Sequence, residues 1–385
     1  MWLSHLFHVK KVGSGPDCVC FFVCFFVCFA VRFSFRFLNM IYNGRLSSLS
    51  HGGGCGCKIA PGVLSDILKS SPVRQIPAAL LAGNDNNEDA AVYQLNDHQA
   101  IVATTDFFMP MVDDPYQFGR IAATNAISDI YAMGAQPLFA LALLGVPINV
   151  LPLEVIQQIT LGGESVCAEA GILIAGGHSI DSVEPIYGLV AIGVVDPKHM
   201  KRNSGAKPGD SIILSKPLGV GVLSAALKKE QLSDAAYQEL IAITTKLNKP
   251  GQRLAQLDTV HALTDVTGFG LAGHLLELCR GAKLSAQIQW DAIPVIEEAA
   301  KLVKDDVFTG ASVRNWSGYG HEIQMSGALQ AWHQNLLSDP QTSGGLLIAC
   351  DPGASDQVLD ILRADGFTNA KNIGTFAEGS GLSVV

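Results

Sequence analysis

The chain has 385 residues, a length typical of two or three domains, and its 48% of hydrophobic residues excludes a largely disordered protein. Its formal net charge of −9 disfavours general binding to the phosphates of nucleic acids. Its mean hydropathy of +0.29 is high for a soluble protein and would suggest membrane contact if it applied to the whole chain.

The first 50 residues differ in kind from the rest. They hold five Lys or Arg and one acidic residue, together with nine of the 17 Phe and four of the nine Cys. The remainder carries 21 basic and 34 acidic residues, a net charge of −13. The uncharged run at 18–31 is shorter than the ~20 residues of a membrane helix and has the length of a signal-peptide hydrophobic region. No cleavage site of small residues follows it.

Three interpretations of this extension are open: a targeting or membrane segment, an ordered part of the fold, or a non-native leader translated from a start too far upstream. We favour the leader, because Met40 offers a natural internal start. The four Cys have neither the spacing nor the neighbouring His of a zinc site, and they do not resemble a disulfide framework. Without the extension, we expect a cytoplasmic protein with no nucleic-acid partner and no stable membrane contact.

Alternating strands and helices are predicted from residue 101 onward. The expected strands are 100–105, 138–144, 172–175, 187–195, 211–215, 285–290 and 345–350. The expected helices are 120–133, 153–170, 235–249, 271–280 and 355–363. A polar stretch with Gly and Pro at 203–209 is the predicted domain boundary. The predicted organisation is an extension (1–50), a Gly-rich flap with its lead-in (51–88), an N-terminal domain (89–203) and a C-terminal domain (204–385).

Residues 51–58, here called the flap, read His-Gly-Gly-Gly-Cys-Gly-Cys-Lys. Four glycines deprive this segment of stiffness, which suits a loop that carries a thiol and an amine to a substrate. A thiolate at Cys55 would have its pKa lowered by the nearby charge of Lys58. A flexible linker and a Cys-x-Cys metal half-site are the alternatives.

Four aspartates, Asp89, Asp106, Asp129 and Asp265, adjoin apolar sequence. Buried carboxylates are costly unless they are paired, and Mg²⁺ with phosphate oxygens is one such pairing. Each acid alone would more often be a helix cap or a surface residue, but the four together favour a metal–phosphate site.

Two glycine patterns are weaker signals. Gly176 and Gly177 follow a predicted strand and precede His178 and Ser179, an arrangement that suits either anion binding or a plain turn. Residues 268–273 match G-x-G-x-x-G, but no doubly wound series of strands begins there, so a nicotinamide site is not favoured. The phosphate-binding motif G-x-x-x-x-G-K-[ST] is absent from the sequence.

Six stretches of the sequence resemble motifs of the selenophosphate synthetase (selenide, water dikinase) family: residues 51–58, 104–110, 119–129, 175–181, 263–270 and 339–345. They keep the family's order and cover about residues 50–385. The resemblance implies an α+β fold of two domains like that of aminoimidazole ribonucleotide synthetase. It also implies a reaction in which ATP, selenide and water give selenophosphate, phosphate and AMP. Mg²⁺ as cofactor and a homodimer joined through the N-terminal domains are implied as well, and a monovalent cation and a selenium-delivery protein are left open as further partners.

The same resemblance implies roles for individual residues. Cys55 stands where the family has Cys or selenocysteine, and Lys58 matches the catalytic lysine. The implied metal ligands are Asp89, Asp129 and Asp265. The implied ATP contacts are Lys58, Asn86, Asn87, Glu88, Asp106, Asp129, Gly177, His178 and Ser179. Two alternatives are kept: another ATP-using enzyme of the same fold, acting on a ribonucleotide or thiamine phosphate, and a non-catalytic relative.

Overall fold

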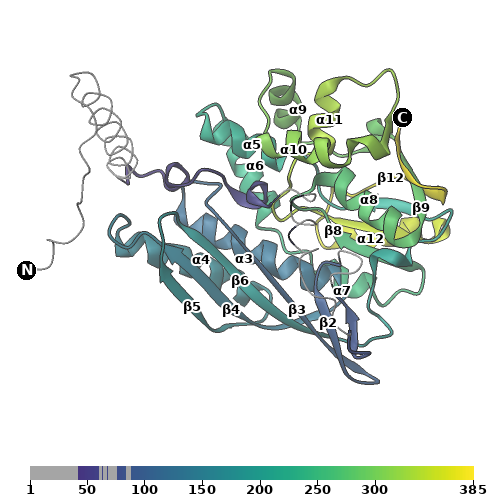
Figure 1. Ribbon diagram of the computed structural model, residues 1–385, viewed down its shortest axis with the longest axis horizontal. Coiled ribbons are helices and arrows are strands. Elements are labelled where there is room, and N and C mark those ends of the chain that lie inside the picture. Colours follow the sequence, from purple (N-terminus) through teal and green to yellow (C-terminus); the bar gives the residue numbers. More distant parts are fainter. Residues whose placement is uncertain (1–41, 60–62, 64–66, 68–75, 84–87) are drawn as a thin grey trace, which may run out of the picture. The chain divides into compact units, whose positions relative to one another are not determined.

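A computed structural model describes residues 42–59, 63, 67, 76–83 and 88–385 (Figure 1). The predicted extension therefore lies mostly outside the described residues, as do Asn86 and Asn87, two of the predicted ATP contacts. Backbone contacts divide the chain into 1–43 and 44–385, and every element named below belongs to the second unit. In the described part of the chain, no helix has the length and hydropathy needed to span a membrane.

The N-terminal half is a sheet of six strands in the order β1-β2-β3-β6-β4-β5, antiparallel except for the β4–β5 pair. Its strands are β1 (Leu80–Ala82), β2 (Ala91–Asn96), β3 (Gln99–Phe108), β4 (Gln136–Val146), β5 (Ile174–Asp181) and β6 (Ile186–Val195). Helices α3 (Pro115–Ala132) and α4 (Leu153–Glu169) pack together against one face (Figure 1).

The alternation of buried and exposed side chains along β3 explains why helices cover only one face of this sheet. Ala100, Val102 and Phe108 are buried on the face toward α3, whereas Phe107 on the opposite face is half exposed. Successive side chains of a strand point to opposite faces, so Asp106 is carried with the buried set toward the helix. The strand thus delivers one carboxylate to the helix-covered side of the sheet.

The C-terminal half is a sheet of seven strands in the order β10-β13-β9-β12-β7-β11-β8. Its strands are β7 (Ser211–Leu214), β8 (Val260–Asp265), β9 (Leu284–Ile288), β10 (Ile323–Met325), β11 (Leu346–Cys350), β12 (Lys371–Glu378) and β13 (Gly381–Val384). The α-helices are α5 (Val220–Lys228), α6 (Asp234–Thr244), α7 (Pro250–Leu254), α8 (Gly270–Ala282), α9 (Glu297–Lys304), α10 (Gly310–Tyr319), α11 (Ala331–Leu337) and α12 (Ser355–Ala364). Short 3-10 helices are η1 (Leu46–Leu49), η2 (Gly54–Cys57), η4 (Asn203–Gly205), η5 (Trp290–Ala292), η6 (Gly320–Glu322) and η7 (Pro352–Ala354).

Both faces of this second sheet are covered. Ile212 and Leu214 of β7 belong to one apolar cluster, which includes α8, whereas Ile213 belongs to another, which includes α12. A strand buried on both sides reads as a continuous apolar run, and that is why 211–215 was predictable without alternation.

Most predicted elements are present with shifted ends, but two differ more. β5 continues through Gly176 and Gly177 to Asp181, because its backbone pairs in parallel with β4 along this length. Its side chains are almost all exposed, so no apolar pattern marked it. The predicted helix 235–249 ends at Thr244, and a separate helix begins at Pro250, a residue that favours a helix start.

Candidate active site

The flap lies against both halves of the structure; Figure 1 shows residues 44–58, in purple, running between them. The Gly54 amide donates to the Met109 carbonyl at 2.9 Å, and the Cys55 amide donates to Thr342 Oγ1 at 2.9 Å. Gly54 has a φ of +55°, and a Cβ there would collide with Thr342, so only glycine suits this contact. Arg314 of α10 donates to the Gly56 carbonyl at 3.1 Å. The flap is therefore an ordered part of the site and not a linker.

Cys55 is 1% exposed, and its Sγ lies 3.2 Å from Asn125 Oδ1 on α3. Burial raises the pKa of the Cys55 thiol, and the charge of Asp106 raises it further. The prediction that the pKa of Cys55 lies below that of a free thiol is therefore wrong for the docked flap. Lys58 does act in that direction, but the loss of water around the sulfur outweighs it.

Lys58 pairs with the carboxylate that β3 delivers. Its Nζ lies 3.5 Å from Asp106 Oδ2, and Asp106 is the main cause that raises the pKa of Lys58. Asp106 also accepts a hydrogen bond from Asn125 Nδ2. Cys55, Lys58 and Asp106 line a cavity of about 310 Å³. A thiol and a charged amine thus open onto one cavity.

Asp89, Asp129 and Asp265 meet although they come from three distant segments. Each offers an oxygen within 4.8 Å of the others, from the bend just before β2, from α3 and from the end of β8. Burial raises the pKa of each, and the charge of Asp265 raises the pKa of the other two further. Clustered acids of this kind repel one another unless a cation or protons neutralise them.

Hydroxyl groups orient these three carboxylates. Thr264 Oγ1 donates to Asp89 at 2.8 Å, and Thr104 Oγ1 donates to Asp129 at 2.5 Å. Ser128 donates to Asp265. Among the described residues, the buried Oδ2 of Asp89 has no hydrogen-bond partner. An all-oxygen cluster with one unsatisfied buried oxygen fits a hard divalent cation such as Mg²⁺.

Other predicted contacts lie apart from this cluster. Gly177, His178 and Ser179 lie on the exposed edge strand β5, three strand spacings from β3, or about 14 Å. Within one chain the structure does not bring them to the aspartates. Glu88 is next to Asp89, and its carboxylate accepts from the Asn203 amide at 3.0 Å.

Sequence reasoning assigned no role to several polar residues that hold the flap in place. Asn125 contacts Cys55 and Asp106, and Thr342 and Ser343 contact the Cys55 amide and Asn125. Two signals could have indicated them: an amide within an otherwise apolar helix, and a polar run, 339–345, directly before a buried strand. Such residues need partners, which only the packing reveals.

The G-x-G-x-x-G match has a different physical basis from dinucleotide binding. It does join a strand, β8, to a helix, α8, but β8 pairs antiparallel with β11 and lies at the edge of the sheet. A Cβ on Gly268 would lie 2.8 Å from Lys58 Cδ and 3.1 Å from the Cys55 carbonyl. This glycine allows the flap to approach closely.

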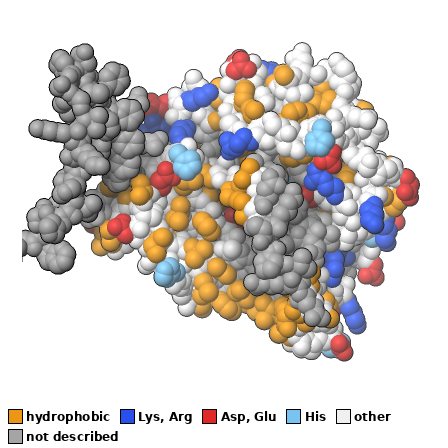
Figure 2. Space-filling view, viewed as in Figure 1, with side chains coloured by type: hydrophobic (Ala, Val, Ile, Leu, Met, Phe, Trp, Pro, Cys, Tyr) orange, Lys and Arg blue, Asp and Glu red, His pale blue; other side chains and the backbone are white. Residues whose placement is uncertain are grey.

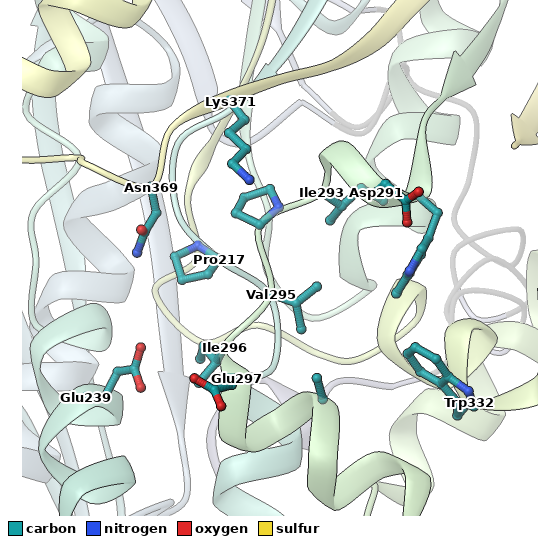
Figure 3. A pocket seen from close by; sticks show the side chains of 13 residues that line it. Pro217, Glu239, Asp291, Ile293, Val295, Ile296, Glu297, Trp332, Asn369 and Lys371 are labelled. Atoms are coloured by element: carbon teal, nitrogen blue, oxygen red, sulfur yellow. The ribbon is translucent and has the colours of Figure 1, made fainter.

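A second cavity, of about 490 Å³, lies in the C-terminal half and contains none of the predicted site residues. Figure 3 shows that its polar side chains, among them Glu239, Asp291 and Lys371, come from separate places around it and do not converge. Glu297, which also lines it, is paired with Lys301 at 2.7 Å. Among the described residues, the polar groups of this cavity do not converge as those at the flap do.

Comparisons with known proteins show the family of the chain. The family models for the N-terminal and C-terminal domains of AIR synthase related protein match residues 87–195 and 207–385. The selenide, water dikinase of Paraburkholderia xenovorans (strain LB400) is 64% identical over 337 residues, 88% of this chain and 95% of that protein. The protein of the same name from Rhizobium meliloti (strain 1021) is 53% identical over 336 residues, 87% of this chain and 96% of its own length.

Solved structures share the fold at low identity. One is a complex of AaThiL with AMPPCP and TMP, with a TM-score of 0.61 and 18% identity, covering 84% of this chain and 92% of that one. Another is a HypE–HypF complex, with a TM-score of 0.62 and 19% identity, covering 84% and 95%. The predicted α+β fold, with two domains like those of aminoimidazole ribonucleotide synthetase, is confirmed.

Proposed function

The chain belongs to the selenide, water dikinase family, and from this membership we propose that the flap and the three clustered aspartates form its catalytic centre. The enzyme makes selenophosphate from selenide, ATP and water. The observation that carries the assignment of the site is the docking of Cys55 and Lys58 beside Asp106, which lies on the same side of the sheet as Asp129.

Each group has a distinct task in this proposal. ATP carries about four negative charges, and Mg²⁺ held by Asp89, Asp129 and Asp265 would neutralise them and polarise the phosphoryl groups. Asp106 favours the charged form of Lys58, so its ammonium is ready to bind phosphate oxygens. Cys55 is the group that meets selenide. The docked flap excludes water from the sulfur of Cys55, whereas the side chain of Lys58 stays 40% exposed at the cavity.

Selenide-dependent turnover of ATP tests this function directly. In a ³¹P NMR assay we expect selenophosphate, phosphate and AMP to form only when selenide and Mg²⁺ are both present. A chelator should stop the reaction, and added Mg²⁺ should restore it. A chain that begins at Met40 should give the same rate, since we propose that the extension takes no part in the chemistry. Release of ADP instead of AMP, or turnover without selenide, would indicate a different activity.

A kinase acting on thiamine phosphate is the less favoured alternative. It shares the fold, as the AaThiL complex illustrates, but at 18% identity that likeness concerns the fold alone. The Cys55 thiol has no evident use in phosphorylating a ready-made phosphate ester. The same assay decides, because such a kinase would consume ATP with thiamine phosphate and without selenide.

We also propose a homodimer joined through the N-terminal sheet. The face of this sheet turned away from α3 and α4 exposes large apolar side chains, including Tyr93, Leu95, Phe107 and Ile180, each about half exposed. Figure 2 shows hydrophobic side chains gathered over this part of the molecule. Large exposed apolar patches mark association sites. Since 177–179 lie on the edge strand of this sheet, any contact they make with ATP would require the second copy.

A charge placed on this face is expected to separate the dimer. Ile180→Asp puts a carboxylate on β5, where dimerisation would bury it, so light scattering should give the mass of a monomer at micromolar concentration. Val313→Asp is the matched control, because Val313 is similarly exposed (49%) but lies on α10 in the other half. A dimer that survives Ile180→Asp would place the interface elsewhere.

A further inference from the structure

We propose that Asn125 is a positioning residue that keeps the flap docked only while the thiol of Cys55 carries its proton. This inference rests on the proposed function, in which the flap brings that thiol to the substrate. It follows from the hydrogen-bonding partners around the Asn125 amide and needs no bound ligand or metal.

The orientation of the Asn125 amide is fixed by its two other partners. The backbone N–H of Ser343, which can only donate, lies 2.7 Å from Oδ1. Nδ2 donates to the carboxylate of Asp106, which also faces the ammonium of Lys58. A flipped amide would set its NH₂ against the Ser343 N–H and its oxygen against a carboxylate. The atom facing Cys55 is therefore the oxygen.

The sulfur must then be the donor. Cys55 Sγ lies 3.2 Å from Asn125 Oδ1, an atom that only accepts hydrogen bonds. A thiolate there would lose this bond and face the negative end of the amide dipole. At 1% exposure, water cannot take over the missing interaction. Burial also raises the pKa of the thiol. Among the charged groups that act on the thiol, Asp106 and Asp265 favour its neutral form, whereas Lys58 favours the thiolate.

The surface that receives the flap is held firmly. Thr342 Oγ1 accepts from the Cys55 amide, and Ser343 has a φ of +50°, a left-handed conformation that non-glycine residues seldom adopt. This conformation is secured by Lys216, a buried side chain whose Nζ donates to the Ser343 carbonyl at 2.7 Å, and by a bond from Ser343 Oγ to the Ile121 carbonyl at 3.2 Å. Because Ser343 is fixed in this way, the Asn125 amide that accepts from its N–H has little freedom to rotate and present its NH₂ group to a thiolate.

Loss of the thiol proton to solvent would therefore release the flap. The thiolate cannot donate to Asn125 Oδ1, so it would move away from this oxygen, gain access to water and become reactive. The docked state stores Cys55 as an unreactive neutral thiol, and the released state exposes it. Cys57, in the same flap, is only partly buried and is not among the hydrogen-bond partners of Asn125 in the described part of the chain, so it supplies an internal comparison.

The test is the pH dependence of alkylation at Cys55 in the full chain, with iodoacetamide and localisation of the label by mass spectrometry. In the unsubstituted protein we expect the rate to rise with pH around a midpoint above the ~8.5 of a free thiol. Asn125→Ala should lower that midpoint by about one unit or more, so that labelling near pH 9 is several-fold faster. Asn125→Asp should raise the midpoint, because its carboxylate opposes a thiolate.

The controls separate this role from a loosened fold. Thr342→Val removes the acceptor of the Cys55 amide and also a hydroxyl that lowers the pKa of the thiol, so it should loosen the flap yet raise the midpoint, the opposite of Asn125→Ala. The Cys57 profile should be unchanged in all variants. Equal midpoints for Cys55 in the unsubstituted protein and both Asn125 variants would overturn the proposal; if Asn125→Ala does not fold, the Asn125→Asp shift decides. Alkylation uses neither ATP nor selenide, so this result stands apart from the ³¹P NMR assay.

Discussion

Cys55→Ser is expected to abolish selenide-dependent AMP formation, with a loss of at least about 1,000-fold, or about 4 kcal/mol of transition-state stabilisation. Serine has nearly the same shape, and its hydroxyl can donate to Asn125 Oδ1 as the thiol does, so the flap should still dock. What disappears is the soft, ionisable sulfur that would engage selenide. The loss would therefore report on chemistry and not on folding.

The matched control for this variant is Cys57→Ser, two residues along the same flap. Cys57 is only partly buried, and we expect its replacement to leave the rate within about threefold, as surface changes usually cost little. Rates should be followed as AMP formed with saturating ATP, with and without selenide. Full activity in Cys55→Ser, or equal losses in both variants, would contradict a catalytic role for the Cys55 thiol.

Asp129→Asn is expected to have two opposite effects. It should reduce ATP-dependent activity by at least about 1,000-fold, because it removes one of three carboxylates that would hold Mg²⁺. Without metal, it should raise the free energy of unfolding by on the order of 1 kcal/mol, because it relieves like-charge repulsion within the cluster. A variant that is more stable but inactive is typical of a functional site.

Thermal unfolding with and without Mg²⁺ measures the second effect. Mg²⁺ should raise the Tm of the unsubstituted protein clearly and that of Asp129→Asn much less, since a ligand stabilises only as far as it binds the folded state. Asp291→Asn, in the second cavity, is the control and should change neither activity nor the response to Mg²⁺. An unaltered Mg²⁺ response in Asp129→Asn would argue against a metal at these three aspartates.

Much of the secondary structure could be predicted, for reasons visible in particular elements. β7 is a short run of buried apolar residues, and α4 begins just after Pro152 with an amphipathic pattern, so local sequence was enough for both. The predicted strand 172–175 ended too early, because the side chains of β5 face solvent and its backbone pairing with β4 leaves no hydrophobic pattern in the sequence. The helix predicted through residue 249 missed the new start at Pro250.

The residues of the site, too, could be predicted only in part. The flap motif with Cys55 and Lys58, and the aspartates beside apolar sequence, were recognisable because each is unusual in its own surroundings. Nothing local indicated that Asn125 would face both Cys55 and Asp106, or that Thr342 would receive the flap from nearly 300 residues away. Those partners depend on how the two halves meet, which no single segment encodes.

By itself the sequence distinguished an apolar, basic N-terminal segment from an acidic remainder, and it pointed to the thiol and amine of the flap and to the acids beside apolar sequence as candidate site residues. Only the tertiary structure decided that Asp89, Asp129 and Asp265 converge while 177–179 stay at a sheet edge, and that Cys55 is a buried thiol with a raised pKa. The physical reason is that the sequence shows the charged Lys58 close to Cys55 along the chain, whereas the loss of water around the Cys55 sulfur depends on which residues pack over it.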